Sequence, residues 1–427
     1  SYLATAALVA IMAGTPIIMS SVMDRGHEIP KSAFAEPLAF LALGAFMIAG
    51  HWWKAAARQA YVIPALACMI VFLLLAGFSS AISDIPSVAI FGSYYRREGL
   101  LAWMSYAAVF ASIIVLGSSL ERRKDLLDVM ILTSIVPCSY ALLQRIDLDI
   151  FRYIGHEIDR PMGTLGNPLF LGAYLGILLP LSIVRIWASS WRSVSFPLWA
   201  FLAVLQAITL FLTQSRGPIL AFLAVSLGLL CVIGAHERSR RMFVLAALIF
   251  LSISTSVVLI NVSENAGKIA QQTPVISRLV YSSNKGASIG TQKGSGSMTT
   301  RLSVLQAGVE TFIDAPLVNQ LIGFAPDSAY VHFFPHMPNS AMQTEGYWQS
   351  NSFDRLHADT LDIGLNFGLL GWLSYSWFSM LLPVRCLVEL ALSRPGRFHF
   401  LSQSAARRVL PWQSRPEFHM PPHPPSA

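Results

Sequence analysis

The chain alternates long apolar segments with short polar ones, and this pattern constrains its fold more than any other feature. A helix needs about 20 mostly apolar residues to cross the roughly 30 Å hydrocarbon core of a bilayer. Only 12% of the 427 residues are charged, against about 25% in a typical soluble protein. We therefore predict an all-α polytopic membrane protein with about ten transmembrane helices. The predicted spans are residues 2–20, 34–50, 60–81, 100–119, 126–143, 167–186, 196–213, 217–234, 242–261 and 359–383.

The one long polar segment, residues 262–358, separates the last two predicted spans. Residues 262–299 are rich in Gly and Ser, which is typical of a flexible segment. Residues 300–358 contain more aromatic side chains, and we expect them to form a folded cap. The remaining organisation is nine spans in residues 1–261, the last span in 359–383 and a basic, Pro-rich cytoplasmic tail in 384–427.

The charges of the loops indicate the orientation. With the N-terminus in the cytoplasm, the short cytoplasmic loops carry ten basic and three acidic residues, and the short outer loops carry eight of each. Cytoplasmic loops of membrane proteins are enriched in Lys and Arg. The long loop then lies on the outer side and both termini lie in the cytoplasm. The net charge of +7 is thus explained by topology, and we expect no nucleic-acid partner.

Two adjacent arginines, Arg96 and Arg97, lie where the fourth predicted span begins at the outer side. They belong to the sequence Phe91-Gly-Ser-Tyr-Tyr-Arg-Arg-Glu-Gly-Leu-Leu101. A guanidinium group can bind phosphate oxygens through two parallel hydrogen bonds, so this pair suits a lipid diphosphate. The alternative is an interfacial anchor for the helix end.

A second block, residues 160–172, reads Arg-Pro-Met-Gly-Thr-Leu-Gly-Asn-Pro-Leu-Phe-Leu-Gly. Its glycines predict a turn, and Pro168 is well suited to the first position of the following helix. The N-terminus of that helix can bind an anion with its free N–H groups. A helix start without any ligand is equally consistent with the sequence.

The turn Thr213-Gln-Ser-Arg-Gly217 joins two predicted spans. A charged residue in such a turn is costly unless it is paired or functional, which makes Arg216 a candidate site residue. The alternative is that Arg216 extends toward the lipid headgroups of the outer leaflet.

The long loop re-enters the membrane through Asp354-Arg-Leu-His-Ala-Asp-Thr-Leu-Asp362. His357 can accept a proton near neutral pH, and it lies among several charged residues at a membrane boundary. We interpret His357 as a candidate general base, although a single histidine is more often structural.

These blocks, in this order, resemble the O-antigen ligase/polymerase superfamily of polytopic membrane glycosyltransferases. The resemblance extends over residues 60–383 and includes Thr300-Arg301 and the run Leu321-Ile-Gly-Phe-Ala-Pro-Asp327 in the long loop. It implies transfer of a glycan from an undecaprenyl-diphosphate carrier at the outer face of the bacterial inner membrane. The acceptor would be lipid A-core, a second lipid-linked repeat unit or a protein, and the sequence does not distinguish ligase from polymerase.

The resemblance also implies roles for individual residues. It marks His357 and five arginines as functional: Arg96, Arg97, Arg216, Arg301 and Arg355. From the chemistry of these side chains we expect His357 and Arg216 to be catalytic, with His357 as general base and Arg216 stabilising the departing diphosphate. We expect Arg96, Arg97, Arg301 and Arg355 to bind the diphosphate. The donor carries its own leaving group, so no nucleotide, metal or other cofactor is expected; the expected partners are the lipid-linked oligosaccharide, the acceptor and membrane lipids.

The chain departs from the family pattern in two places. Ala358 follows the loop histidine where the family often has Asn, and the Pro-rich tail follows where members commonly have about two more spans. The second departure predicts a truncated, frame-shifted or divergent member, whose activity stays open. Two other functions remain as alternatives: a multi-span transporter of an anionic solute, and a non-catalytic partner in envelope-polysaccharide export.

Overall fold

The structure, a computed structural model, is all-α in the parts of the chain that it describes. Every secondary-structure element there is a helix, which confirms the predicted fold class. The described residues are 2–22, 26–50, 62–94, 96–116, 120–151, 160–236, 293–337, 355–356 and 358–392, with isolated positions between 244 and 251.

Five helical segments are long and apolar enough to cross a membrane. They are α2 (Glu28–Ile48), the apolar part of α4 (Val62–Ala81), α7 with α8 (Leu120–Thr133 and Ile135–Arg145), α9 (Pro168–Ala188) and α10 (Ser195–Leu212). Three others are apolar over a shorter length: α1 (Tyr2–Gly14), α6 (Leu100–Leu116) and the first part of α11 (Arg216–His236). The chain is therefore a multi-pass membrane protein by composition, while the number of ten spans stays a prediction. Most of the predicted span 242–261 lies outside the described residues.

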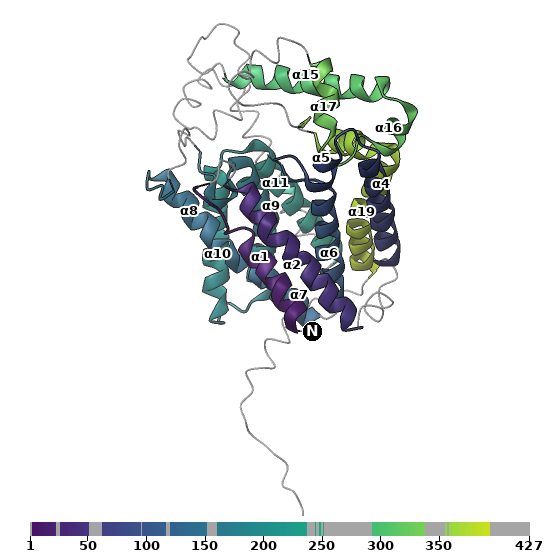
Figure 1. The fold of residues 1–427 in the computed structure, drawn as a ribbon. Coiled ribbons are helices and arrows are strands. Elements are labelled where there is room, and N and C mark those ends of the chain that lie inside the picture. Colours follow the sequence, from purple (N-terminus) through teal and green to yellow (C-terminus); the bar gives the residue numbers. More distant parts are fainter. Residues whose placement is uncertain are drawn as a thin grey trace, which may run out of the picture.

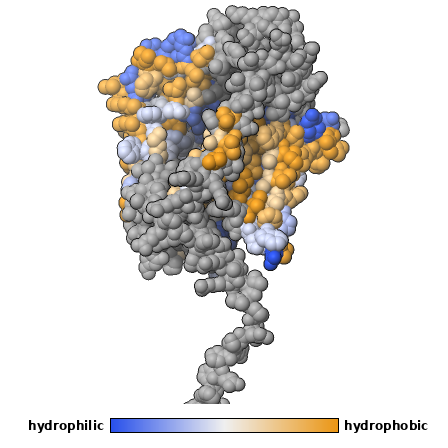
Figure 2. Space-filling model, turned by 180° about the vertical axis from the view of Figure 1, so that it is seen from behind, coloured by the Kyte–Doolittle hydropathy of each residue, from blue (hydrophilic) through white to orange (hydrophobic). Residues whose placement is uncertain are grey.

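The outer surface of the helices is strongly apolar. Figure 2 shows hydrophobic residues along much of the coloured flank of the molecule. Leu74 and Phe78 on α4 and Trp377 on the last helix are each more than half exposed. Monomeric soluble proteins rarely expose apolar surface of this extent, whereas a lipid bilayer accommodates it.

Prolines account for two differences from the predicted spans. The first predicted span reaches residue 20, but α1 ends at Gly14, because Pro16 disfavours the helical conformation at the residue before it. The fifth predicted span is divided at Ser134 into α7 and α8. Pro137 has no N–H to donate to the carbonyl of Thr133, so the helical hydrogen bonds are interrupted there.

Three of the buried clusters join helices of the bundle, and small and aliphatic side chains fill the first two. Ala4, Leu8 and Ala42 are buried where α1 and α2 meet α6. Cys138 and Leu175 are buried among α8, α9, α10 and α11. Alanine and other small residues allow the close helix approach that stabilises membrane bundles. The third cluster joins α4, α6 and α19 (Asp359–Leu392), the last helix of the chain.

A layer of helices lies across one end of this bundle (Figure 1). It comprises α15 (Lys293–Asp314), α16 (Leu317–Ile322), α17 (Ala329–Phe333) and the 3-10 turn η2 (Phe334–His336). We call residues 293–337 the α15 layer. Its buried core includes Val304, Ala307 and Phe333, together with Leu365 of α19. The first helix of the chain begins at the opposite end of the bundle (Figure 1).

The last helix is interrupted at Gly368, where the sequence predicted one continuous span, residues 359–383. Gly368 has φ 65° and ψ −175°, which is not helical, and the helix continues past the predicted end to Leu392. A Cβ on Gly368 would lie 2.4 Å from the backbone N of Ile322, and a Cβ on Gly323 would lie 2.3 Å from the backbone O of Asn366. The glycine pair lets the end of α16 cross α19 in direct backbone contact, and the N–H of Phe324 donates to the carbonyl of Leu365 at 2.9 Å.

This crossing makes Gly368 sensitive to substitution. We expect Gly368→Ala to lower stability by about 1–3 kcal/mol or more, because a Cβ meets backbone atoms and the left-handed region is strained for alanine. Gly364→Ala is the matched control: it lies one turn earlier, with no atom within 4 Å of the added Cβ, and it should be neutral or slightly stabilising. Thermal unfolding of the two detergent-purified variants tests this, and equal unfolding temperatures would contradict the crossing.

Candidate functional site

The first arginine block forms a tight loop between α5 (Pro86–Phe91) and α6. We call residues 92–99 the Arg96 loop. Its two ends touch, because a Cβ on Gly99 would lie only 2.2 Å from the backbone N of Gly92. Gly92 has φ 81°, and Arg97 has the unusual φ of 57°. Non-glycine residues adopt positive φ at a cost and persist where surrounding contacts fix them, so the loop has a defined shape.

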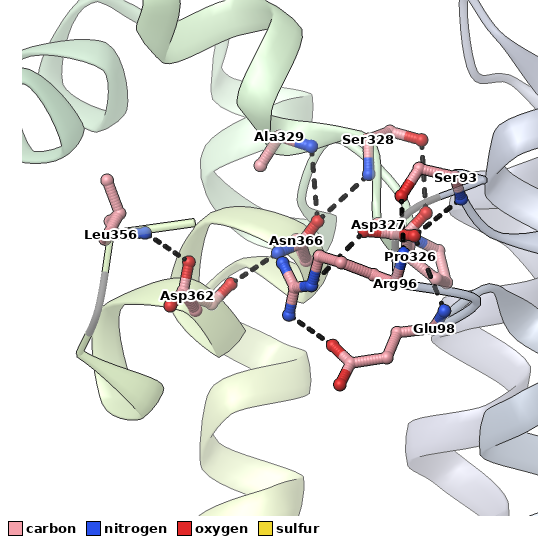
Figure 3. A network of polar contacts seen from close by, with 10 residues as sticks. All are labelled: Ser93, Arg96, Glu98, Pro326, Asp327, Ser328, Ala329, Leu356, Asp362 and Asn366. Atoms are coloured by element: carbon pink, nitrogen blue, oxygen red, sulfur yellow. Dashed lines mark hydrogen bonds and ion pairs between the residues drawn. The ribbon is translucent and has the colours of Figure 1, made fainter. Parts of the chain in front are cut away.

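The carboxylate of Asp327 binds the Arg96 loop. Its Oδ2 accepts hydrogen bonds from the backbone N–H of Ser93 at 2.6 Å and of Glu98 at 3.4 Å. Its Oδ1 is 3.7 Å from Nε of Arg96, whose guanidinium also pairs with the carboxylate of Glu98. Figure 3 shows these groups pointing toward one another. The side chain of Asp327 is fully buried and that of Arg96 is 10% exposed, so the ion pair is shielded from water.

A second set of hydrogen bonds connects Asp327 to the last helix. The backbone N–H groups of Ser328 and Ala329 both donate to Oδ1 of Asn366 at 3.2 Å. The side-chain amide of Asn366 donates to the carbonyl O of Asp362 at 2.8 Å, and Oδ1 of Asp362 accepts from the backbone N–H of Leu356 at 2.9 Å. These bonds are visible in Figure 3. The network thus runs from the Arg96 loop through the α15 layer and α19 to Leu356, in the segment 354–362 where the long loop re-enters the membrane in the predicted topology.

Leu356 and Arg355 fix the described part of the segment 354–362. Leu356 is 1% exposed, and a Cβ on Gly308 of α15 would lie 2.5 Å from its Cδ1. The guanidinium of Arg355 lies 5.9 Å from the ring centroid of Phe170, at the start of α9, which is within cation–π range. His357, the residue after Leu356, lies outside the described residues.

The turn at residues 213–217 is held by Arg160. Its Nε donates to the carbonyl O of Thr213 at 2.8 Å, and its Nη2 donates to Oγ of Ser215 at 2.7 Å. These bonds fix the turn that immediately precedes Arg216, the first residue of α11. Arg216 itself is exposed. No individual role was predicted for Arg160 from the sequence. The structure shows that it connects the segment 160–172 to the turn at residues 213–217.

The second block is built as a turn followed by a helix start, as its sequence indicates. Asn167 caps α9 by accepting a hydrogen bond from the N–H of Leu169 at 2.8 Å, and Pro168 occupies the first helical turn. Oε1 of Gln144 accepts from the N–H groups of Met162 and Gly163 at 3.1 and 2.8 Å. The turn is therefore anchored to α8 by one buried amide.

The structure brings some predicted site residues together. Arg96 and Arg355 both interact electrostatically with the carboxylate of Asp362. The Arg96 loop and the segment 354–362 therefore share one site. Nε of Arg97 is buried and has no hydrogen-bond partner within the described parts of the chain. Arg301 lies on α15. The structure describes neither the side chain of Arg301 nor His357, so their positions relative to the other arginines remain predictions.

Burial shifts the pKa of two side chains of the α15 layer, His332 and Tyr330. His332 stacks on Phe324 with ring centroids 4.1 Å apart, and its Nε2 lies 3.9 Å from Oδ2 of Asp84. Burial lowers the pKa of His332, although Asp84 raises it in part. Burial, with a smaller effect of Asp327, raises the pKa of Tyr330.

The sequence analysis did not identify Asn366 or Asp327 as site residues. Asp327 ends the run Leu321–Asp327 that contributed to the family resemblance, but its partners lie more than 200 positions earlier in the chain. The sequence signal for Asp327 was an acidic residue directly after Pro326 within that run. Asn366 had no comparable signal, because a single polar residue in an apolar helix has many possible partners.

Residues 201–376 match the family model described as O-antigen ligase. Comparisons with curated proteins and with solved structures gave no significant match. The match confirms the resemblance found in the sequence, and it contains Asp327, Asp362 and Asn366. The Arg96 loop lies outside the matched residues, yet Asp327 binds it directly. The site therefore combines the matched domain with the preceding helices.

The buried pair of Asp327 and Arg96 leads to a stability prediction. Asp327→Asn keeps the shape of the side chain but removes the buried negative charge that faces the Arg96 guanidinium. Removing one partner of a buried ion pair typically costs about 3–5 kcal/mol, so the variant should unfold at a clearly lower temperature. Asp314→Asn, at the exposed end of α15, is the control. Indistinguishable unfolding temperatures of the two variants would show that the network contributes nothing to stability.

Proposed function

We propose that the chain belongs to the O-antigen ligase/polymerase superfamily, since residues 201–376 match the family model described as O-antigen ligase, and that it transfers a glycan from undecaprenyl diphosphate to an acceptor hydroxyl. The family supports glycan transfer at a membrane in general; the carrier, the site residues and the orientation are our proposal. We place the reaction at the end of the bundle covered by the α15 layer. In the proposed topology this end faces outward from the bacterial inner membrane.

One observation carries the proposal. The hydrogen-bond network centred on Asp327 joins the Arg96 loop to the family domain and extends to Leu356, the residue before His357. Segments that are distant in the sequence and rich in arginine thus meet at one end of an apolar bundle. An amphiphilic donor fits this arrangement, because its lipid would remain beside the apolar flank while its diphosphate reaches the arginines.

The proposed reaction is a single displacement at the anomeric carbon of the donor sugar. The acceptor oxygen forms a bond to this carbon as the bond to the diphosphate oxygen breaks. His357 accepts the proton of the acceptor hydroxyl, and the electron pair of the broken bond leaves with the diphosphate. General base catalysis of this kind typically contributes about 10²–10⁴-fold, and a single displacement inverts the configuration at the anomeric carbon.

Arg216 is the proposed residue that stabilises the departing diphosphate. It is exposed and occupies the first position of α11, where the helix dipole adds positive potential. Arg160 holds the turn on which it lies. A fixed cation that faces the developing charge lowers the barrier without further reorganisation.

The other arginines divide into two roles in this proposal. Arg355, Arg97 and Arg301 bind the diphosphate. Arg96 was predicted to bind it as well, but Asp327 and Glu98 balance its charge. We therefore propose that Arg96 contributes by holding the shape of its loop, which places Arg97 at the site.

Glycan transfer by the purified protein tests this function. Undecaprenyl-diphosphate oligosaccharide and an acceptor in proteoliposomes should give a product with inverted anomeric configuration. His357→Ala should lower the rate by about 10²–10⁴-fold, and Arg216→Ala by about 10²–10³-fold. Arg192→Ala is the control, because Arg192 is exposed in the α9–α10 loop and lies over Trp191.

Two results would contradict the assignment. Wild-type rates in both site variants would exclude His357 and Arg216 as catalytic residues. Flux of an anionic solute through the proteoliposomes without any glycan transfer would favour a transporter instead.

A further inference from the structure

We propose that Asp362 is a positioning residue that acts through the backbone of Leu356 to place His357. This inference rests on the proposed function, in which His357 is the general base. Neither the family match nor the sequence pattern assigns such a role to Asp362. Leu356 is held on one side by a hydrogen bond to Asp362 and on the other by packing against Gly308.

The first contact is a hydrogen bond between a side chain and the backbone. Oδ1 of Asp362 accepts from the N–H of Leu356 at 2.9 Å, and Asp362 itself is 8% exposed. A buried carboxylate is costly without partners. Here the N–H of Leu356 satisfies one of its oxygens, and the bond fixes the Arg355–Leu356 peptide, which lies one residue before His357.

The second contact holds Leu356 from the opposite side. Its side chain is 1% exposed and lies against Gly308 of α15. A Cβ at position 308 would come within 2.5 Å of Cδ1 of Leu356, so a glycine is needed for this close packing. Leu356 is thus fixed between α15 and the first turn of α19.

The position of Asp362 is itself coupled to the rest of the site. Its carbonyl O accepts from the amide of Asn366, which also binds the N–H groups of Ser328 and Ala329 next to Asp327. The same network that holds the Arg96 loop therefore sets the position of the residue before His357. A displacement of about 1 Å in a reacting group can cost about 10²-fold in rate, so such support is of functional value.

The substitutions at Asp362 separate a hydrogen-bond role from a charge role. Asp362→Asn retains an oxygen that can accept from Leu356 and removes the negative charge; Asp362→Ala removes both. We expect the Asn variant to retain kcat within about threefold, and the Ala variant to lose about 10–100-fold in kcat with KM for the donor nearly unchanged. Asp359→Ala, an exposed carboxylate in the same helical turn, should behave as wild type.

A second route perturbs Leu356 without touching Asp362. Gly308→Ala places a methyl group against Cδ1 of Leu356 and should also lower kcat more than KM. This variant decides the question if Asp362→Ala does not yield folded, monodisperse protein. Thermal unfolding of each purified variant separates loss of fold from loss of position.

The outcomes distinguish this inference from the proposed function. Wild-type kcat in both Asp362→Ala and Gly308→Ala would overturn the positioning role, and so would an Asn variant as impaired as the Ala variant. If instead His357→Ala retained full transfer, the proposed base would be wrong whatever the Asp362 variants did. A drop in kcat that Asn rescues, in an enzyme that requires His357, supports both.

Discussion

The buried carboxylate of Asp327 is the contact on which the candidate site depends. One of its oxygens accepts from two backbone N–H groups of the Arg96 loop, and the other faces the guanidinium of Arg96. A buried carboxylate is tolerated only where cations and donors compensate the loss of water. The loop and the α15 layer therefore require each other: without Asp327 the loop loses its anchor, and without the loop Asp327 is an uncompensated charge.

Close backbone contact makes this arrangement possible. Gly323 and Gly368 allow α16 to cross α19 directly, which places Asp327 beside the Arg96 loop and Ser328 and Ala329 within reach of Asn366. The interruption at Gly368 also separates the first turns of α19, which carry Asp362 and Asn366, from the long apolar part that follows. On this backbone, a side chain at position 368 would clash with the backbone of Leu321 and Ile322. The crossing therefore requires a glycine at position 368.

The sequence predicted the features that depend on local composition. Apolar runs of sufficient length predicted the helices, and Asn167 with Pro168 predicted the start of α9. Contacts between distant residues were not predictable, because nothing near Asp327 in the sequence indicates Ser93, and nothing near Arg160 indicates Thr213. The helix break at Gly368 was missed for the same reason, since a glycine in an apolar helix indicates close packing but not the backbone that approaches it. The arginines at the predicted membrane boundaries were visible in the sequence, whereas the pairing of Arg96 with acidic partners required the fold.

We propose that the diphosphate of a lipid-linked donor binds at the end of the bundle covered by the α15 layer. The most direct measurement is a structure of the full chain with bound undecaprenyl diphosphate. We expect the diphosphate to contact Arg216 and His357 to lie next to the position of the transferred sugar. A diphosphate bound at the opposite end of the bundle, beside the ion pair of Arg185 and Asp128, would contradict it.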